Sequence, residues 1–157
     1  MNKIQTLSLT ALRLTIGWMF FYAGITKVLN PEWSAAGYLN SAKAFAGFYG
    51  WLASPNILPI ANFANEWGLT LLGIALILGV GVRLAAYLGA MMMVLYWLPL
   101  GLPHPNEHAY IVDEHLIYAS ALVVLAAFRA GHIFGLEKWC AGLPICSRFP
   151  KLRRLLG

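Results

Sequence analysis

Side chains that could move a proton are few in this chain and stand at the edges of apolar runs. Glu66 precedes the apolar run 67–82, and Asp113 and His115 precede a second run. A carboxylate at the edge of hydrocarbon is costly unless it is paired or hydrogen-bonded, which makes it a functional candidate. Carboxylates and imidazole are also common general acids and bases. We therefore take Glu66, Asp113 and His115 as candidate catalytic residues.

Other residue types could hold a ligand beside these groups. Lys27 could bind an anionic or polar head group, and Tyr22 and Tyr96 could each donate a hydroxyl into the interior of a helix bundle. Trp67 adjoins the carboxylate just described, and Arg13 lies between two leucines with no local carboxylate. These five are the candidate binding residues, although aromatic residues near helix ends commonly form a membrane belt or pack against neighbours.

The composition is that of a membrane protein. Hydrophobic residues make up 60% of the 157 residues, charged residues only 11%, and the mean hydropathy is +0.68. Soluble domains have about 25% charged residues, and a bilayer-spanning helix needs about 20 apolar residues. Four segments meet this length. The apolar run of the first is too long for a signal peptide, and the residues that follow it are a poor cleavage context. The predicted spans are 6–29, 60–82, 84–102 and 110–131.

Basic residues predict the orientation of these spans. Lys3, Arg83 and Arg129 lie near one side, whereas the segment 103–115 holds three acidic residues and no Lys or Arg. By the positive-inside rule, both termini are cytoplasmic and the chain is a multi-pass protein of the cell membrane. We divide it into a transmembrane domain, 1–139, and a basic cytoplasmic tail, 140–157, that would lie beside anionic lipids. A nucleic-acid partner is not expected, because no nucleic-acid-binding fold accompanies the basic tail.

Short connections predict an all-α fold, a four-helix up-and-down bundle. The first external loop is longer. Asn30 and Pro31 have the residue types of a helix cap and first turn. We expect one or two short helices between there and residue 53, lying on the outer membrane surface or capping the bundle.

Spacing along the helices places the polar residues in two layers. Arg13 to Lys27 and His115 to Arg129 are both fourteen residues apart, which is ~21 Å at 1.5 Å per residue. An inner layer of arginines would extend to lipid phosphates. The outer layer is mixed in sign and could form a site or, alternatively, a structural Lys27–Glu66 ion pair with acidic residues that simply start the last helix.

Metal and haem chemistry are not expected. Pro103 and Pro105 prevent a regular helix at His104 and His108, so these histidines lack the spacing of a helical zinc pair. The chain has no intramembrane histidine pair at helical spacing for haem. Cys140 and Cys146 lack the spacing of a redox pair and fall on the predicted cytoplasmic side. We therefore expect no intrinsic metal or cofactor.

The order of several motifs resembles the DoxX family, and in particular its DoxD-like branch. The resemblance covers about residues 5–139 and is carried by residues 12–31 and 33–39, by Asn65-Glu-Trp-Gly-Leu-Thr-Leu-Leu-Gly73, by Gly79-Val-Gly-Val-Arg83 and by Ile111-Val-Asp-Glu-His-Leu-Ile117. Recurring polar positions of the family correspond to Arg13, Lys27, Glu66, Arg83, Asp113 and His115.

The resemblance implies a four-helix membrane subunit. DoxD-like proteins are associated with thiosulfate:quinone oxidoreductase, which oxidises thiosulfate to tetrathionate and passes electrons to a membrane quinone beside a second subunit. By this resemblance, Lys27 would bind an anionic substrate or a quinone oxygen, while Glu66, Asp113 and His115 would relay protons. The alternative is a non-enzymatic subunit that binds a lipid or isoprenoid or scaffolds a redox complex. A soluble or membrane redox partner and a homo-oligomer are both compatible with the sequence, and a transporter fits less well.

Overall fold

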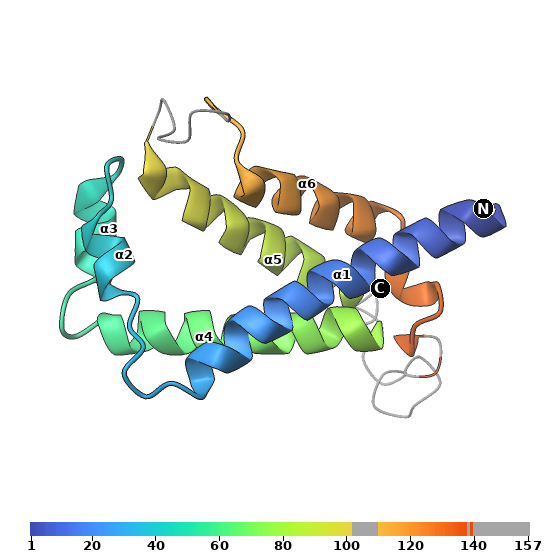
Figure 1. Cartoon of the computed structure of the whole chain (residues 1–157), viewed down its shortest axis with the longest axis horizontal. Helices are drawn as coiled ribbons and strands as arrows, with labels where there is room; N and C mark the ends of the chain where they lie inside the picture. The colour runs from blue at the N-terminus through green and yellow to red at the C-terminus, as the bar shows by residue number, and fades with distance from the viewer. Residues whose placement is uncertain (102–109, 138, 140–157) are drawn as a thin grey trace.

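The computed structural model describes residues 1–101, 110–137 and 139, and the regular structure of these residues is helical throughout (Figure 1). The elements are α1 (Lys3–Val28), α2 (Ala36–Asn40), α3 (Ala46–Leu52), α4 (Leu58–Leu78), α5 (Val82–Trp97), η1 (Leu98–Leu100), α6 (Glu114–Ala127) and η2 (Ala130–His132). The sequence therefore correctly predicted an all-α fold with a helical first loop.

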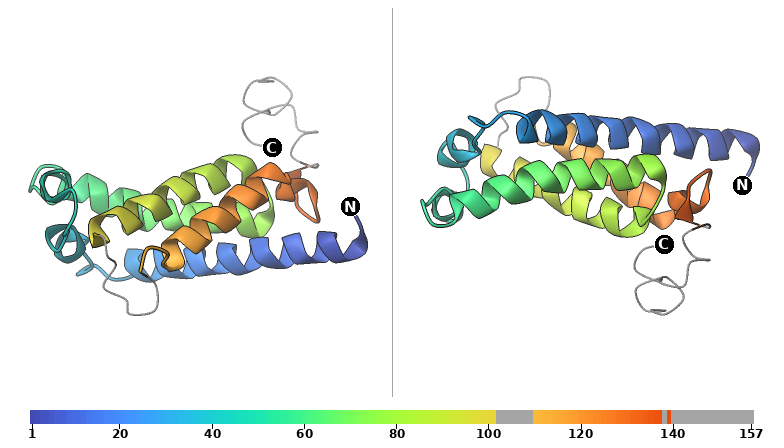
Figure 2. Two further views of the ribbon diagram at one scale, coloured as in Figure 1. Left: turned by 90° about the horizontal axis from the view of Figure 1, so that it is seen from above. Right: turned by 90° about the horizontal axis from the view of Figure 1, so that it is seen from below.

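Two helix pairs form the body of the molecule. α1 packs along α4, and α5 packs along α6 (Figure 2). Gly73 allows the first pair to come close, because a Cβ added there would lie only 2.3 Å from the backbone nitrogen of Phe21. Gly24 has the same role against Thr70. Small residues at such contacts are the usual way in which membrane helices pack closely.

The helices α4 and α5, which follow one another in the sequence, are not packed along each other in this way. Gly79 and Gly81 both have positive φ, 70° and 62°, and make the tight turn that joins these helices. From this turn α4 and α5 diverge, and α2 and α3 lie across the wide end (Figure 1). We call this wide end the α2–α3 end of the bundle. The opposite end, where Arg13 of α1 lies, is called the Arg13 end.

Three helices in the described part of the chain are long and apolar enough to cross a membrane: Lys3–Val28, Leu58–Leu78 and Val82–Leu100. α6 is apolar but has 14 residues, about 21 Å of helix. It starts at Glu114 rather than at residue 110, because the Asp113 side chain caps it. The part of the chain that the structure describes is therefore all-helical, with three candidate membrane spans, and the fourth span is still a prediction.

Pro99 explains why α2 and α3 dock where they do. Proline has no N–H, so the carbonyl four residues earlier, that of Leu95, loses its intrahelical partner. The Tyr49 hydroxyl of α3 donates to this carbonyl at 2.7 Å. The backbone N–H of Lys43 donates to the Pro99 carbonyl at 2.8 Å. The short helices thus cap the bundle through groups that the end of α5 leaves free.

One local prediction is wrong. Asn30 does not begin a helix. Its side chain accepts from the N–H of Glu32 at 3.2 Å and its carbonyl accepts from the N–H of Trp33, which makes a turn. The helix begins six residues later, at Ala36. An Asn side chain stabilises such turns as readily as helix caps, so the residue type alone did not distinguish them.

The outer surface of the helices is largely apolar. Trp18, Leu71 and Met91 are 61%, 57% and 57% exposed, although all three lie within candidate spans. Such side chains contact hydrocarbon in a bilayer. The interior includes Phe20, Leu76, Leu122 and Leu125, together with the charged residues Arg13, Asp113 and Glu137.

Candidate functional site: an apolar pocket between α4 and α5

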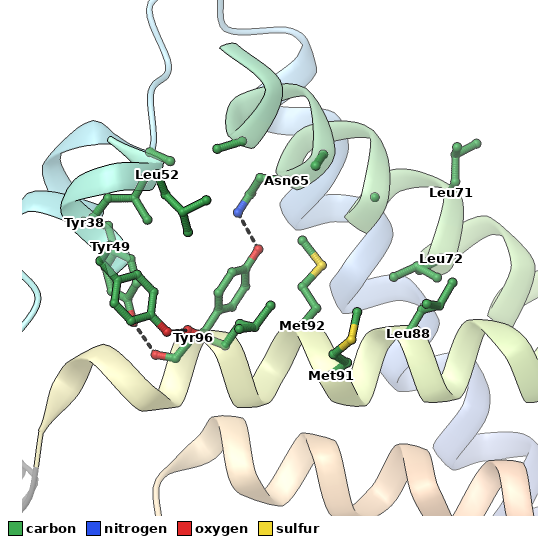
Figure 3. A pocket seen from close by; sticks show the side chains of 16 residues that line it. Tyr38, Tyr49, Leu52, Asn65, Leu71, Leu72, Leu88, Met91, Met92 and Tyr96 are labelled. Carbon is green, nitrogen blue, oxygen red and sulfur yellow. Dashed lines mark hydrogen bonds between the residues drawn. The ribbon is translucent and has the colours of Figure 1, made fainter. Parts of the chain in front are cut away.

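A pocket lies between the diverging helices α4 and α5, and α2 and α3 line one end of it (Figure 3). Its volume is about 510 Å³, and most of its lining is leucine, methionine and alanine. Leu71, Leu88 and Met91 line it and are also exposed on the outer surface of the bundle. The pocket therefore opens sideways, toward the position that lipid occupies.

The polar groups of the pocket gather at the α2–α3 end. The Asn65 amide of α4 donates to the Tyr96 hydroxyl of α5 across the pocket (Figure 3). The Tyr96 hydroxyl hydrogen is then left to donate to another group. Asn65 Oδ1 is buried and has no hydrogen-bond partner among the described residues. The pair thus offers one donor and one acceptor beside an apolar channel, which is the usual composition of a ligand site.

Two further tyrosines line the same end of the pocket from the capping helices. Tyr49 of α3 donates to the carbonyl of Leu95, and Tyr38 of α2 donates to the carbonyl of Tyr96. Burial raises the pKa of Tyr38 to about 12, helped by the nearby Tyr49 and Asp113, and burial also raises the pKa of Tyr49. Both hydroxyls therefore stay protonated near neutral pH and continue to hold α2 and α3 on α5.

The structure brings two of the predicted catalytic residues into contact behind Tyr96. Asp113 Oδ2 lies 2.6 Å from His115 Nδ1, and Asp113 Oδ1 accepts from the backbone N–H groups of His115 and Leu116. Asp113 therefore also starts α6, which was the structural alternative for this residue. The Tyr96 ring packs edge-on against the His115 ring with centroids 5.8 Å apart. This pair thus lies directly beside the pocket without lining it.

Lys27 and Glu66 lie at the same end of the bundle but at the α1–α4 contact. The ammonium of Lys27 lies 5.2 Å from the ring centre of Trp33, and it interacts electrostatically with Glu66. Neither residue lines the pocket described above. The predicted outer layer is therefore divided into two groups, Lys27 with Glu66 and Asp113 with His115.

Tyr22 and Trp67, two predicted binding residues, face outward. Tyr22 is 59% exposed and stacks on Trp18. Trp67 is 40% exposed and packs against Phe63. Such positions suit a membrane-belt aromatic, which was the alternative interpretation of both residues.

Arg13 is not at the lipid surface, so the prediction that it extends to lipid phosphates is wrong. It is 1% exposed, and its guanidinium donates to the carbonyls of Ala130, Ile133 and Phe134 at 2.7, 3.0 and 3.2 Å. It lies at the Arg13 end, far along α1 from the pocket. A buried charge must be hydrogen-bonded, and here backbone carbonyls rather than carboxylates supply the partners.

Sequence reasoning missed the residues that make the pocket polar. Asn65, Tyr38 and Tyr49 were not candidates. Asn65 could have been identified, because it is a polar residue within a predicted membrane span and lies next to Glu66. Met91 and Met92 line the pocket, whereas Met93 is core.

Groups of three or more His, Cys, Asp or Glu that could hold a metal are absent from the residues that the structure describes. His104, Glu107 and His108, for which we rejected metal binding, lie outside the described residues, as do Cys140, Cys146 and the basic tail.

Comparison with known proteins gives one match. No curated protein and no solved structure matches the chain. The model of the DoxX family matches residues 8–102, which is more than half of the sequence and includes most of α1, all of α2 to α5 and the whole pocket. The chain therefore belongs to the DoxX family.

Proposed function

We propose that this protein is the membrane subunit of a quinone-linked redox complex and that the pocket between α4 and α5 binds the quinone. One observation carries the proposal: the Asn65–Tyr96 pair places one hydrogen-bond donor and one acceptor at the end of an apolar, laterally open pocket. A membrane quinone has the matching form, a polar ring at the end of a prenyl chain.

The volume and chemistry of the pocket fit such a ligand. About 510 Å³ lies within the ~300–1,000 Å³ common for small-molecule sites. The Tyr96 hydroxyl can donate to a quinone carbonyl, and the buried, unpartnered Asn65 Oδ1 can accept from a quinol hydroxyl. Met91, Met92 and the leucines would surround the first part of the prenyl chain.

A bound quinone would supply a two-electron, two-proton acceptor. In the thiosulfate version of the reaction, two thiosulfate ions would each lose one electron as the S–S bond of tetrathionate forms. Asp113 and His115 can hold a proton beside Tyr96, since their side chains are 2.6 Å apart and His115 is partly exposed. Lys27 stays the predicted contact for an anionic substrate, and Glu66 a predicted proton carrier, at the α1–α4 contact.

The test is quinone binding by a pocket-filling variant. Gly68 lines the pocket, and a Cβ added there would make only ordinary contact with Met92, at 3.7 and 3.9 Å. A leucine at this position therefore fits the helix and occupies the pocket. We expect Gly68→Leu to bind a short-chain quinone at least about tenfold more weakly in nanodiscs, by quenching of tryptophan fluorescence.

The matched control is Gly50→Leu in α3, where an added Cβ meets nothing within 4 Å. This variant should bind as the wild type does. The proposal fails if the wild-type protein does not bind the quinone, or if Gly68→Leu binds it as tightly as Gly50→Leu does.

A second candidate function is favoured by the nearly complete apolar lining of the pocket. The protein would then hold a lipid or isoprenoid, or scaffold a complex, without performing redox chemistry. Native mass spectrometry of the purified protein distinguishes the two by the molecule that co-purifies. Redox activity of the assembled complex that is unchanged in Glu66→Gln and His115→Ala would also favour this second function.

We further propose the cellular setting that the sequence predicts. The protein would be a multi-pass protein of the cell membrane with both termini in the cytoplasm, which places the polar end of the pocket toward the outer face. A soluble or membrane redox partner would supply the electrons, and a homo-oligomer is compatible with the exposed apolar helix faces.

A further inference from the structure

A second buried polar cluster lies at the Arg13 end, where the chain after α6 folds back on the bundle. Besides the three carbonyls that bind Arg13, the backbone N–H of Leu136 donates to the Leu78 carbonyl at 3.1 Å. Residues 129–137, which we call the return segment, are thus hydrogen-bonded to both α1 and α4. No residue of this segment lines the pocket.

The return segment encloses a carboxyl group. Glu137 is 7% exposed, and neither of its carboxyl oxygens has a hydrogen-bond partner in the described part of the chain. Its Oε2 lies 3.9 Å from His132 Nδ1, which is also buried and unpartnered. The carboxyl packs so closely on Gly131 that a Cβ there would lie 1.7 Å from Oε2.

The surroundings of Glu137 favour the neutral carboxyl. An ionised carboxylate without hydrogen bonds is costly to bury. Arg13 from α1 and Arg129 from the return segment act on it electrostatically. Burial outweighs both arginines and raises the pKa of Glu137, which lies outside the membrane-spanning helices, to about 7.

We propose that Glu137 and His132 form a proton-binding site that controls how firmly the return segment is attached to α1 and α4. With a proton on Glu137, the segment encloses a neutral carboxyl and can keep its hydrogen bonds to Arg13. When the proton is lost, the segment encloses a carboxylate without hydrogen bonds, and opening to water relieves the cost. Attachment is therefore strong below neutral pH and weaker above it.

The experiment is hydrogen–deuterium exchange of peptides that cover residues 129–137, in nanodiscs at pH 6 and pH 8. Rates are corrected for the intrinsic pH dependence of exchange. A carboxyl that titrates near 7 when enclosed and near 4.5 when exposed changes the opening equilibrium about tenfold over this range. We expect exchange of the return segment in the wild-type protein to be faster at pH 8 by about that factor.

Two variants separate this effect from a general loosening. Glu137→Gln keeps a neutral side chain of similar shape and should exchange slowly at both pH values. Glu32→Gln, which changes an exposed carboxylate in the first loop, should keep the wild-type difference. The proposal is overturned if wild-type exchange shows no corrected pH difference, or if Glu137→Gln retains it.

A measurement on the wild-type chain covers the case in which Glu137→Gln does not fold. In protein labelled with ¹³C at the glutamate carboxyl carbons, one of the five glutamates should titrate near pH 7. If all five titrate below about pH 5, where exposed glutamates titrate, the proton-binding site does not exist. Because the return segment lies at the end opposite the polar groups of the pocket, quinone binding by Glu137→Gln tests the proposed function separately.

Discussion

The Tyr49 hydroxyl is the clearest single support of the capping helices, and removing it gives a quantitative prediction. Tyr49 is 2% exposed, and its hydroxyl is the partner of the Leu95 carbonyl, which Pro99 deprives of an intrahelical bond. In Tyr49→Phe this partly buried carbonyl loses its partner. Leaving a buried acceptor unsatisfied costs about 1–3 kcal/mol, which is roughly a 5- to 150-fold change in an equilibrium constant.

The amide of Lys43 reports on this change, because it donates to the Pro99 carbonyl only while the cap is docked. Its exchange rate in nanodiscs should rise by the same factor in Tyr49→Phe. The control is Tyr87→Phe, which removes a hydroxyl from an exposed position on α5.

Measuring Tyr49→Phe in a second genetic background tests the cause of the effect rather than its size. Pro99→Ala restores an N–H four residues after Leu95, so the carbonyl no longer depends on Tyr49. The cost of Tyr49→Phe should then fall well below its value in the wild-type background, as a double-mutant cycle measures it. If the two costs are equal, or if Lys43 exchange is unchanged in Tyr49→Phe, the explanation of the cap is wrong.

Three further predictions concern packing, pH and capping. Gly73→Ala places a methyl 2.3 Å from the Phe21 nitrogen, so α1 and α4 must separate, and thermal unfolding in detergent should show a loss of more than about 1 kcal/mol. The pKa of Glu137 is raised on folding, from 4.5 to about 7, so its titration should lower the free energy of unfolding by about 3 kcal/mol between these pH values. Unfolding titrations of Glu137→Gln should lack this contribution. Asp113→Ala should lower the free energy of unfolding by about 1 kcal/mol through loss of the α6 cap. Asp113→Asn keeps a capping side chain, so an equal loss in this variant would show that pairing with His115 contributes more than capping.

The helices were predictable because they depend on the length of apolar runs. Residues 6–29 and 60–82 correspond closely to α1 and α4, since a bilayer requires such lengths whatever the partners are. The predicted helix boundaries were wrong where a residue type has two structural roles. Asn30 makes a turn instead of a cap, and Asp113 makes the last helix start later than predicted by capping α6.

The site was less predictable because it depends on contacts that have no residue pattern. The pocket exists because α4 and α5 diverge from the Gly79–Gly81 turn. The angle between two helices cannot be predicted from the sequence of either helix alone. Arg13 is satisfied by backbone carbonyls, which every residue possesses. Spacing did place Asp113 and His115 at one end, but it did not indicate that Asn65, rather than Glu66, meets Tyr96.

The lateral opening of the pocket past Leu71, Leu88 and Met91 has a consequence for any measured affinity. A ligand that enters there arrives by two-dimensional diffusion from the bilayer, where its mole fraction rather than its aqueous concentration sets occupancy. An apolar ligand will therefore show an apparent affinity that changes with the amount of lipid in the assay. Alkyl detergents compete for the same opening, so binding in micelles should be weaker than binding in nanodiscs at equal ligand-to-protein ratio.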